Sequence, residues 1–318
     1  MRHFSALLGI PLMLTLAACA QPDGASDGSD AAPDQRSAAF EQRATQVAAA
    51  WQAAPDRQAW QTGYVPLQEA TVLPDDVTFS DETKQAFLAG WYREQVTPPT
   101  EQPDDGTIQF PDGTLTVPLL SAAQAYQEID QGDPPPCPGR PAAPPDGGSP
   151  TGGPDDAVGS GPAEDCIPLT VTAVELGTTT IRTSRGEATV PAWLFSIDEL
   201  DAKLARVAVA PSAVGTVPVA PPLSGQTEPE LVSAQDLTVV DGAGLTYRLG
   251  VGACDENIVP LVQEHDDLVV VGGAVTKSPG VCTDQLLLEP VSVTLDAPLG
   301  DRPVLDALTG QVLLLTNN

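Results

Sequence analysis

Basic side chains are scarce in this sequence, which has 14 Lys and Arg against 43 Asp and Glu among its 318 residues. The formal net charge is −29. A surface of this sign repels nucleic acid and anionic lipid headgroups. Composition therefore argues against a nucleic-acid partner. An electrostatic partner would be a cation, either a metal ion or a basic protein, and the simpler interpretation is a solvated acidic surface.

Aromatic residues are also few, at 4% of the chain, and all four tryptophans precede residue 194. Trp51 and Trp91 fall on the apolar faces of predicted helices, where core packing is the expected role. Trp60, Tyr64 and Tyr92 are less clearly buried by the pattern. They are the candidate contacts for a glycan or peptide ligand.

Motifs that carry catalysis or nucleotide binding are missing. The sequence has no phosphate-binding loop, no GxGxxG before a helix, no HExxH and no nucleophile elbow. His265 is the only histidine after His3, and we expect it at the tip of a hairpin. Acid pairs such as Asp104-Asp105 and Asp266-Asp267 arise by chance in a chain with 43 acids. We assign no catalytic residue, no metal ligand and no cofactor, and we lean against an enzyme.

The N-terminus has the pattern of an exported protein. Arg2 and His3 precede an apolar run from Phe4 to Ala18, which has signal-peptide length and is too short for a spanning helix of about 20 residues. The run ends in Leu16-Ala17-Ala18-Cys19, which resembles a bacterial lipobox. The resemblance implies a signal peptide over 1–18, a diacylglyceryl group on the sulfur of Cys19, and anchoring to the cell membrane from outside. An ordinary secretory signal is the alternative.

A flexible tether is expected directly after the anchor. Residues 19–36 are rich in Asp, Gly, Ser, Ala and Pro and contain no aromatic residue, so they have little to bury. Removing residues 1–18 takes away Arg2 alone among the charged side chains. The mature chain therefore keeps a formal charge near −30.

Four cysteines remain if Cys19 is lipidated, and an exported chain is where disulfides persist. Three pairings are open. We favour the two local ones, Cys137–Cys166 and Cys254–Cys282, in which the first closes the base of an insert and the second staples strands. A zinc site is the weaker alternative, because no CxxC occurs.

The pattern from residue 37 to 211 predicts an α+β domain with few helices and an antiparallel sheet. Helices are expected over 37–54, with a short turn at 56–60, over 80–92, and from a capping box at Ser121 and Gln124 to a stop at Gly132. A hairpin is expected over 107–120, then strands over 168–176, 178–184, 188–197 and 205–211. Pro191 demotes the third of these strands to an edge or a broken strand. Residues 133–165 are a Pro- and Gly-rich insert without core-forming residues.

A proline-rich linker over 212–235 separates this region from a small all-β, sandwich-like domain over 236–316. Its strands are expected at 236–240, 245–254, 257–262, 268–275, 287–295 and 311–315.

Several segments together resemble a group of uncharacterised exported lipoproteins of actinobacteria. They are residues 48–52, 63–70, 169–197, 206–212, 245–256 and 291–311. The resemblance implies an extracytoplasmic location and a β-rich build, and it implies no catalytic or binding residue. The interpretation that results is a lipid-anchored, non-catalytic binding or scaffolding module at the cell envelope. Its partners would be the membrane, through the anchor, and another envelope protein or a cell-wall component. The alternatives are an envelope hydrolase acting on wall glycan or peptide, or an inhibitor or sensor of a wall enzyme.

Overall fold

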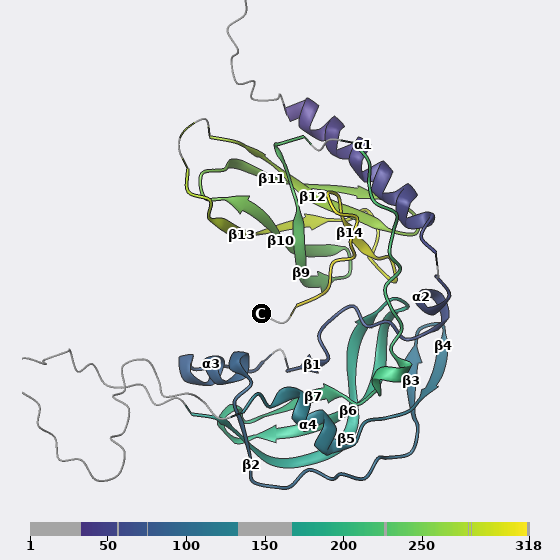
Figure 1. Cartoon of the computed structure of the whole chain (residues 1–318), viewed down its shortest axis with the longest axis vertical. Helices are drawn as coiled ribbons and strands as arrows, with labels where there is room; N and C mark the ends of the chain where they lie inside the picture. The colour runs from purple at the N-terminus through teal and green to yellow at the C-terminus, as the bar shows by residue number, and fades with distance from the viewer. Residues whose placement is uncertain are drawn as a thin grey trace, which may run out of the picture. The chain divides into compact units, whose positions relative to one another are not determined.

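The computed structural model describes residues 33–55, 57–74, 76–132, 167–225, 228–278, 280 and 282–316. Strands predominate over helices in these residues, which form four α-helices and three β-sheets (Figure 1). The predicted mixture of few helices with many strands is therefore confirmed. Contacts place the described residues in one compact unit, so the linker at 212–235 and the separate sandwich-like domain remain predictions.

The features that predict a lipoprotein lie outside the described residues. These are the signal peptide 1–18, the lipidation site Cys19, most of the tether 19–36, the insert 133–165, Cys137 and Cys166. None of the helices in the described part combines the length and the apolar character of a membrane-spanning helix.

The first helix, α1 (Pro33–Gln52), begins four residues before the predicted start at Ser37. Proline fits the first helical position, because the N–H that it lacks would have no partner inside the helix. Residues 33–36, which were predicted to belong to the tether, are therefore helical. The face predicted to be apolar is buried, and it packs in a cluster with Leu268, Val270 and Leu305. The strands that α1 contacts are β11 and β12, near the end of the sequence.

Capping boxes begin two further helices, α3 (Asp81–Ala89) and α4 (Ala122–Ile129). The sequence predicts the box of α4, at Ser121 and Gln124. In α4 the Oγ of Ser121 accepts a hydrogen bond from the backbone N–H of Gln124, whose Oε1 accepts from the N–H of Ser121. Ser80 and Thr83 exchange the same pair of bonds at α3. Each box satisfies two N–H groups that the first turn leaves without partners.

The predicted ends of these two helices are wrong by a few residues. α3 ends at Ala89, because Gly90 takes the left-handed conformation with φ 69° and allows the chain to turn without strain. The next residues enter strand β2 (Tyr92–Glu94) instead of extending the helix. α4 ends at Ile129 with Asp130 as its cap, so Gly132 is not the stop.

The largest sheet has seven strands in the order β1-β7-β6-β3-β4, with β5 on β6 and β2 on β5. Its spine is the long β5–β6 hairpin, in which twelve residue pairs run from Val171↔Ile197 to Thr183↔Gly186. The two strands predicted over 168–184 are one strand, which passes through Gly177 without a break. The strands are β1 (Thr71–Val72), β2, β3 (Gly106–Phe110), β4 (Gly113–Val117), β5 (Leu169–Thr183), β6 (Gly186–Ile197) and β7 (Ala202–Val207).

Pro191 lies in a central strand, so the prediction of an edge or broken strand is wrong. β6 pairs with β5 on one side, and on the other side with β7 from Ala192 onward and with β3 at Thr189. The carbonyl oxygen of Pro191 accepts a hydrogen bond from the N–H of Ala208. In a strand, the N–H and C=O of one residue point to the same side. The N–H that Pro191 lacks would therefore point toward the gap where the neighbour of β6 changes from β7 to β3, and its absence costs no hydrogen bond of the β5–β6 pair.

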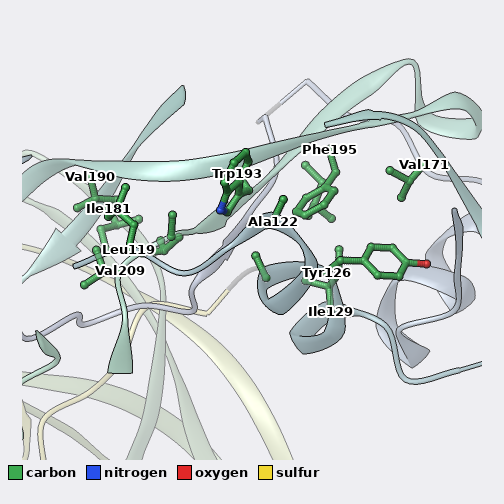
Figure 2. Packing of buried hydrophobic residues seen from close by; sticks show 14 of the residues in the cluster. Leu119, Ala122, Tyr126, Ile129, Val171, Ile181, Val190, Trp193, Phe195 and Val209 are labelled. Carbon is green, nitrogen blue, oxygen red and sulfur yellow. The ribbon is translucent and has the colours of Figure 1, made fainter. Parts of the chain in front are cut away.

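Helix α4 covers one face of this sheet. Its Ala122, Tyr126 and Ile129 pack against the β5 and β6 residues Val171 and Phe195 (Figure 2). The rings of Tyr126 and Phe195 lie 6.1 Å apart between centroids, in a tilted arrangement. Each such buried side chain contributes about 1.5–3 kcal/mol through removal of apolar surface from water.

The other two sheets contain three and four strands. One has the order β13-β10-β9, and the other has the order β11-β12-β14 with β8 also on β12. β10 alternates buried and half-buried residues, and its buried face packs in one cluster with Val269, Val271 and Val275 of β12. The strands are β8 (Leu231–Val232), β9 (Ala234–Asp241), β10 (Gly244–Gly252), β11 (Glu256–Glu264), β12 (Val269–Thr276), β13 (Leu286–Thr294) and β14 (Val304–Asp306).

One expectation for this region, the strand over 311–315, needs correction. The predicted strand over 311–315 forms only isolated bridges, at Val312 and Leu315, while the short strand β14 was not expected. β8 lies inside the predicted linker 212–235, and Val214 of the same segment bridges Tyr64.

Cys254 and Cys282 form the predicted disulfide, with their Cα atoms 6.0 Å apart. It joins the β10–β11 turn to the loop before β13, so it links the loops at one end of two paired strands and not the strands themselves.

Candidate functional site

A cavity of about 870 Å³ lies at the tip of the β5–β6 hairpin. Its walls come from α2 (Gln58–Thr62), from the hairpin tip, and from three turns between later strands. Four arginines line it in a chain that has only 14 basic residues. We refer to it as the arginine cavity. The arginines are Arg57, Arg182, Arg185 and Arg302.

The hairpin tip is built by a tight turn. Gly186 has φ 87°, a conformation that other residues adopt only with strain. The hydroxyl of Thr183 donates to the carbonyl oxygen of Gly186 at 2.8 Å and accepts from the N–H of Arg185 at 3.1 Å. The hydroxyl of Ser184 donates to the carbonyl oxygen of Trp60 at 2.7 Å, so α2 is held on the tip.

Arg182 is the buried cation of the cavity, with 6% of its surface exposed. Its Nη1 donates to the carbonyl oxygen of Gly300 at 3.2 Å, and its Nη2 donates to that of Arg302 at 2.9 Å. It forms no ion pair with any carboxylate that the structure describes. Burial lowers the pKa of Arg182 to about 10, and the charges of Glu187 and Asp301 oppose this shift. The guanidinium is therefore charged at neutral pH.

Arg57 is the second arginine of the cavity that forms no ion pair with a carboxylate among the described residues. Its guanidinium carbon lies 5.6 Å from the ring centroid of Trp51, at the distance of a cation–π contact. Its Nε is buried and finds no hydrogen-bond partner among the described residues. The rings of Trp51 and Trp60 pack edge to face at 5.1 Å, so the buried Trp51 supports Arg57 and Trp60, which line the cavity.

Arg185 and Arg302 are fully engaged by the protein. The guanidinium of Arg185 binds Asp112 through Nε and Nη2, with 2.7 Å between Nη2 and Oδ1, and lies 3.8 Å above the ring centroid of Phe110. Arg302 pairs with Glu264 at 2.9 Å and donates to four carbonyl oxygens in the neighbouring turns. These two arginines form part of the cavity walls, and their charges are already paired with Asp112 and Glu264.

Carboxylates surround the arginine cavity at its exposed edge. Glu187, Asp266, Asp267 and Asp301 line it, and all four are exposed. None of them pairs with a cation among the described residues. The cavity thus has a basic floor, formed by Arg182 and Arg57, and an acidic rim.

The three aromatic residues predicted as ligand contacts lie in different places. Trp60 lines the arginine cavity, although only 5% of it is exposed. Tyr92 lines a smaller cavity of about 490 Å³ with Tyr126 and Asp130. Tyr64 is buried in the core of the large sheet. The structure brings none of these three together.

No catalytic or metal-binding role is predicted for His265 or for the acid pairs, and the structure shows where they lie. His265 lies in the β11–β12 turn, where its N–H donates to the carbonyl oxygen of Leu268, and its Nε2 is buried without a partner among the described residues. It lines a cavity of about 470 Å³ that shares Asp266 and residues 298–302 with the arginine cavity. Asp266 and Asp267 belong to the acidic rim, whereas Asp104 and Asp105 lie elsewhere.

Sequence reasoning missed the arginines. Arg57 and Arg182 are 125 positions apart along the chain, and neither belongs to a motif. The only signal in the sequence was that arginine is rare in such an acidic chain. Carboxylates are numerous enough to pair with every arginine, so a buried arginine without an ion pair calls for another explanation.

No protein-family model, curated protein or solved structure matches this chain. The resemblance to exported lipoproteins of actinobacteria therefore remains a prediction from the sequence.

Proposed function

We propose that this chain is a lipid-anchored binding protein on the outer face of a bacterial cell membrane, and that the arginine cavity is its ligand site. The lipobox-like Leu16-Ala17-Ala18-Cys19 supports the anchor. The Cys254–Cys282 disulfide supports an oxidising, extracytoplasmic compartment. A component of the cell wall is the ligand that such a location makes most accessible.

The observation that carries the proposal is the state of Arg182. Arg182 is buried without a direct ion pair to a described carboxylate, and Glu187 and Asp301 act on its charge without contacting it in a salt bridge. Burying such a charge costs several kcal/mol, and hydrogen bonds to two carbonyl oxygens offset part of that cost. In the proposed function, a ligand supplies further acceptors for its remaining N–H groups. Arg182 lines a cavity large enough for a small molecule or a short segment of polymer.

Among the described residues, neither of the two carboxylates with a shifted pKa, Asp112 and Glu264, has the raised pKa of a catalytic acid. A hydrolase of wall glycan needs a carboxylic acid whose pKa is raised enough to donate a proton. The hydrogen bond from Arg185 lowers the pKa of Asp112. Burial raises the pKa of Glu264, but hydrogen bonds from the Asp296 N–H and from Arg302 outweigh this effect and lower it overall. Both groups stay ionised at neutral pH.

We also propose that residues 236–316 with β8 form a sandwich-like unit. The support is the single apolar cluster shared by β10 and β12, which belong to different sheets. The hydroxyl of Tyr247 in β10 donates to the carbonyl oxygen of Gly272 in β12 at 2.8 Å, as expected for two facing layers about 10 Å apart.

Two experiments on the full chain test the proposed function. Expressed in an actinobacterium, the protein should incorporate a labelled fatty acid and remain with the membrane, while Cys19→Ala should release it. The detergent-solubilised protein should also sediment with purified cell-wall sacculi. Arg57→Gln should weaken sedimentation, and Arg93→Gln, at an exposed arginine outside the arginine cavity, should not. Sedimentation that is absent, or equal in all three proteins, contradicts the proposal.

A further inference from the structure

The arrangement of charge in the arginine cavity also indicates the chemical class of its ligand. The floor carries the guanidinium groups of the buried Arg182 and the half-buried Arg57, and the exposed rim carries four carboxylates. A uniformly anionic ligand would be attracted by the floor and repelled by the rim, in a protein that is itself strongly anionic. An uncharged sugar would leave the floor charges uncompensated. The two layers together fit a molecule with charges of both signs.

The floor is suited to a carboxylate. A guanidinium has five N–H donors, and the two bonds from Arg182 to carbonyl oxygens leave three of them without a partner among the described residues. The buried Nε of Arg57 adds one more. Planar guanidinium donors match the two oxygens of a carboxylate, and their partial burial strengthens the attraction.

The rim is suited to an ammonium group. Glu187 follows Gly186 at the hairpin tip, and Asp301 follows Gly300, whose carbonyl oxygen holds Arg182. Both acids act on the charge of Arg182, so they lie close enough to its site to act on a ligand held there. Exposed and without ion partners among the described residues, they remain free to attract a cation.

We propose that the arginine cavity recognises a short peptide with a free terminal carboxylate and a free amino group, the carboxylate against Arg182 and Arg57 and the amino group at the acidic rim. The indole of Trp60, in the same wall, packs against the apolar part between the two charged ends. This inference rests on the proposed function, because it names the chemical class of the ligand for the same cavity.

The test uses the full chain in detergent and two tripeptide libraries of the same randomised sequences. Both libraries begin with N-acetylated lysine, so the lysine side chain carries their only free amino group at that end. One library has a free C-terminal carboxylate, and the other is identical except for a C-terminal amide. Binding is read from tryptophan fluorescence and from the thermal midpoint. We expect the acid library to bind about thirtyfold more tightly than the amide library, as removal of one partner of a buried charge pair implies.

Variants identify which residues of the cavity bind the carboxylate end of the peptide and which bind the amino end. Arg57→Gln should weaken binding of the acid library and leave the amide library unchanged. Arg57→Gln is preferred to Arg182→Gln, because Arg182 also holds the hairpin on residues 300–302 and its replacement could unfold the protein. Glu187→Gln with Asp301→Asn should weaken only peptides that keep the lysine, compared with a norleucine library. Arg93→Gln is the control, and it should change none of these values.

The outcomes separate this inference from the proposed function. If sacculi bind in an Arg57-dependent way but the acid and amide libraries bind equally, or inorganic phosphate competes as well as the acid library, the peptide assignment is overturned and the binding function stands. If neither sacculi nor either library binds, both fail.

Discussion

Asp306 in β14 accepts a hydrogen bond from the backbone N–H of Ala234, 72 positions earlier in the chain, at 2.8 Å. Asp306 is 1% exposed. Its other oxygen accepts from the N–H and the hydroxyl of Thr309, at 2.8 and 2.7 Å. One buried carboxylate thus fixes the start of β9, in the three-stranded sheet, to the end of β14, in the four-stranded sheet.

Asp306→Asn should reduce the free energy of unfolding by about 2–4 kcal/mol. The amide has the same shape but only one acceptor oxygen, so an N–H of Ala234 or Thr309 loses a charged acceptor in a buried site. Urea unfolding followed by circular dichroism measures the change. Asp104→Asn, at an exposed acid outside the arginine cavity, is the matched control and should stay within about 0.5 kcal/mol of wild type. Equal loss in both variants would contradict the role of Asp306.

Removal of the disulfide with Cys254→Ser and Cys282→Ser should destabilise the protein by up to about 3.6 kcal/mol. The sequence separation is 28 residues, and the value is the loop entropy that the cross-link removes from the unfolded chain. Denaturant unfolding of the double variant gives the difference. Wild-type protein under a thiol reductant should approach the double variant, and an unchanged midpoint would show that the bond does not stabilise this fold.

Stability should fall steeply above about pH 10, the ordinary pKa of a tyrosine. Burial raises the pKa of Tyr64, Tyr92 and Tyr247 far above that value. The folded state therefore keeps protons that the unfolded chain releases, and each phenol removes about 1.4 kcal/mol per pH unit above its unfolded pKa. Ultraviolet titration measures phenolate directly. Of four tyrosines, three should ionise only as the protein unfolds, and normal titration of all four would contradict their burial.

Gly273→Ala should destabilise the protein by about 1–3 kcal/mol, because a Cβ there would overlap the side chain of Leu249 in β10 and press on Val232 in β8. Thermal unfolding detects this as a lower midpoint. Gly280→Ala offers a control in open space, where the nearest atom is the Ser278 Oγ at 3.7 Å. A stable Gly273→Ala protein would mean that the facing layers are farther apart than described.

Local sequence patterns were sufficient for features that depend on neighbouring residues. The capping box at Ser121 and Gln124, the apolar face of α1 and the hairpin turn after Phe110 are where the pattern places them. Hydrogen bonds and side-chain contacts within a few residues decide each of these, so the sequence contains the information directly. The pairing of Cys254 with Cys282, at a separation of 28 residues, was one of three open pairings and was favoured because it is local.

Only the tertiary structure decided the features that depend on which distant segments meet. Pro191 is tolerated in a central strand because its neighbouring strand changes at that residue. α1 packs on strands β11 and β12, more than two hundred positions later. The arginine cavity exists because the β5–β6 hairpin tip meets α2 and residues 298–303. Which charges form ion pairs depends on three-dimensional distance, and the sequence, in which acids outnumber bases three to one, does not show that Arg182 forms no ion pair with a described carboxylate.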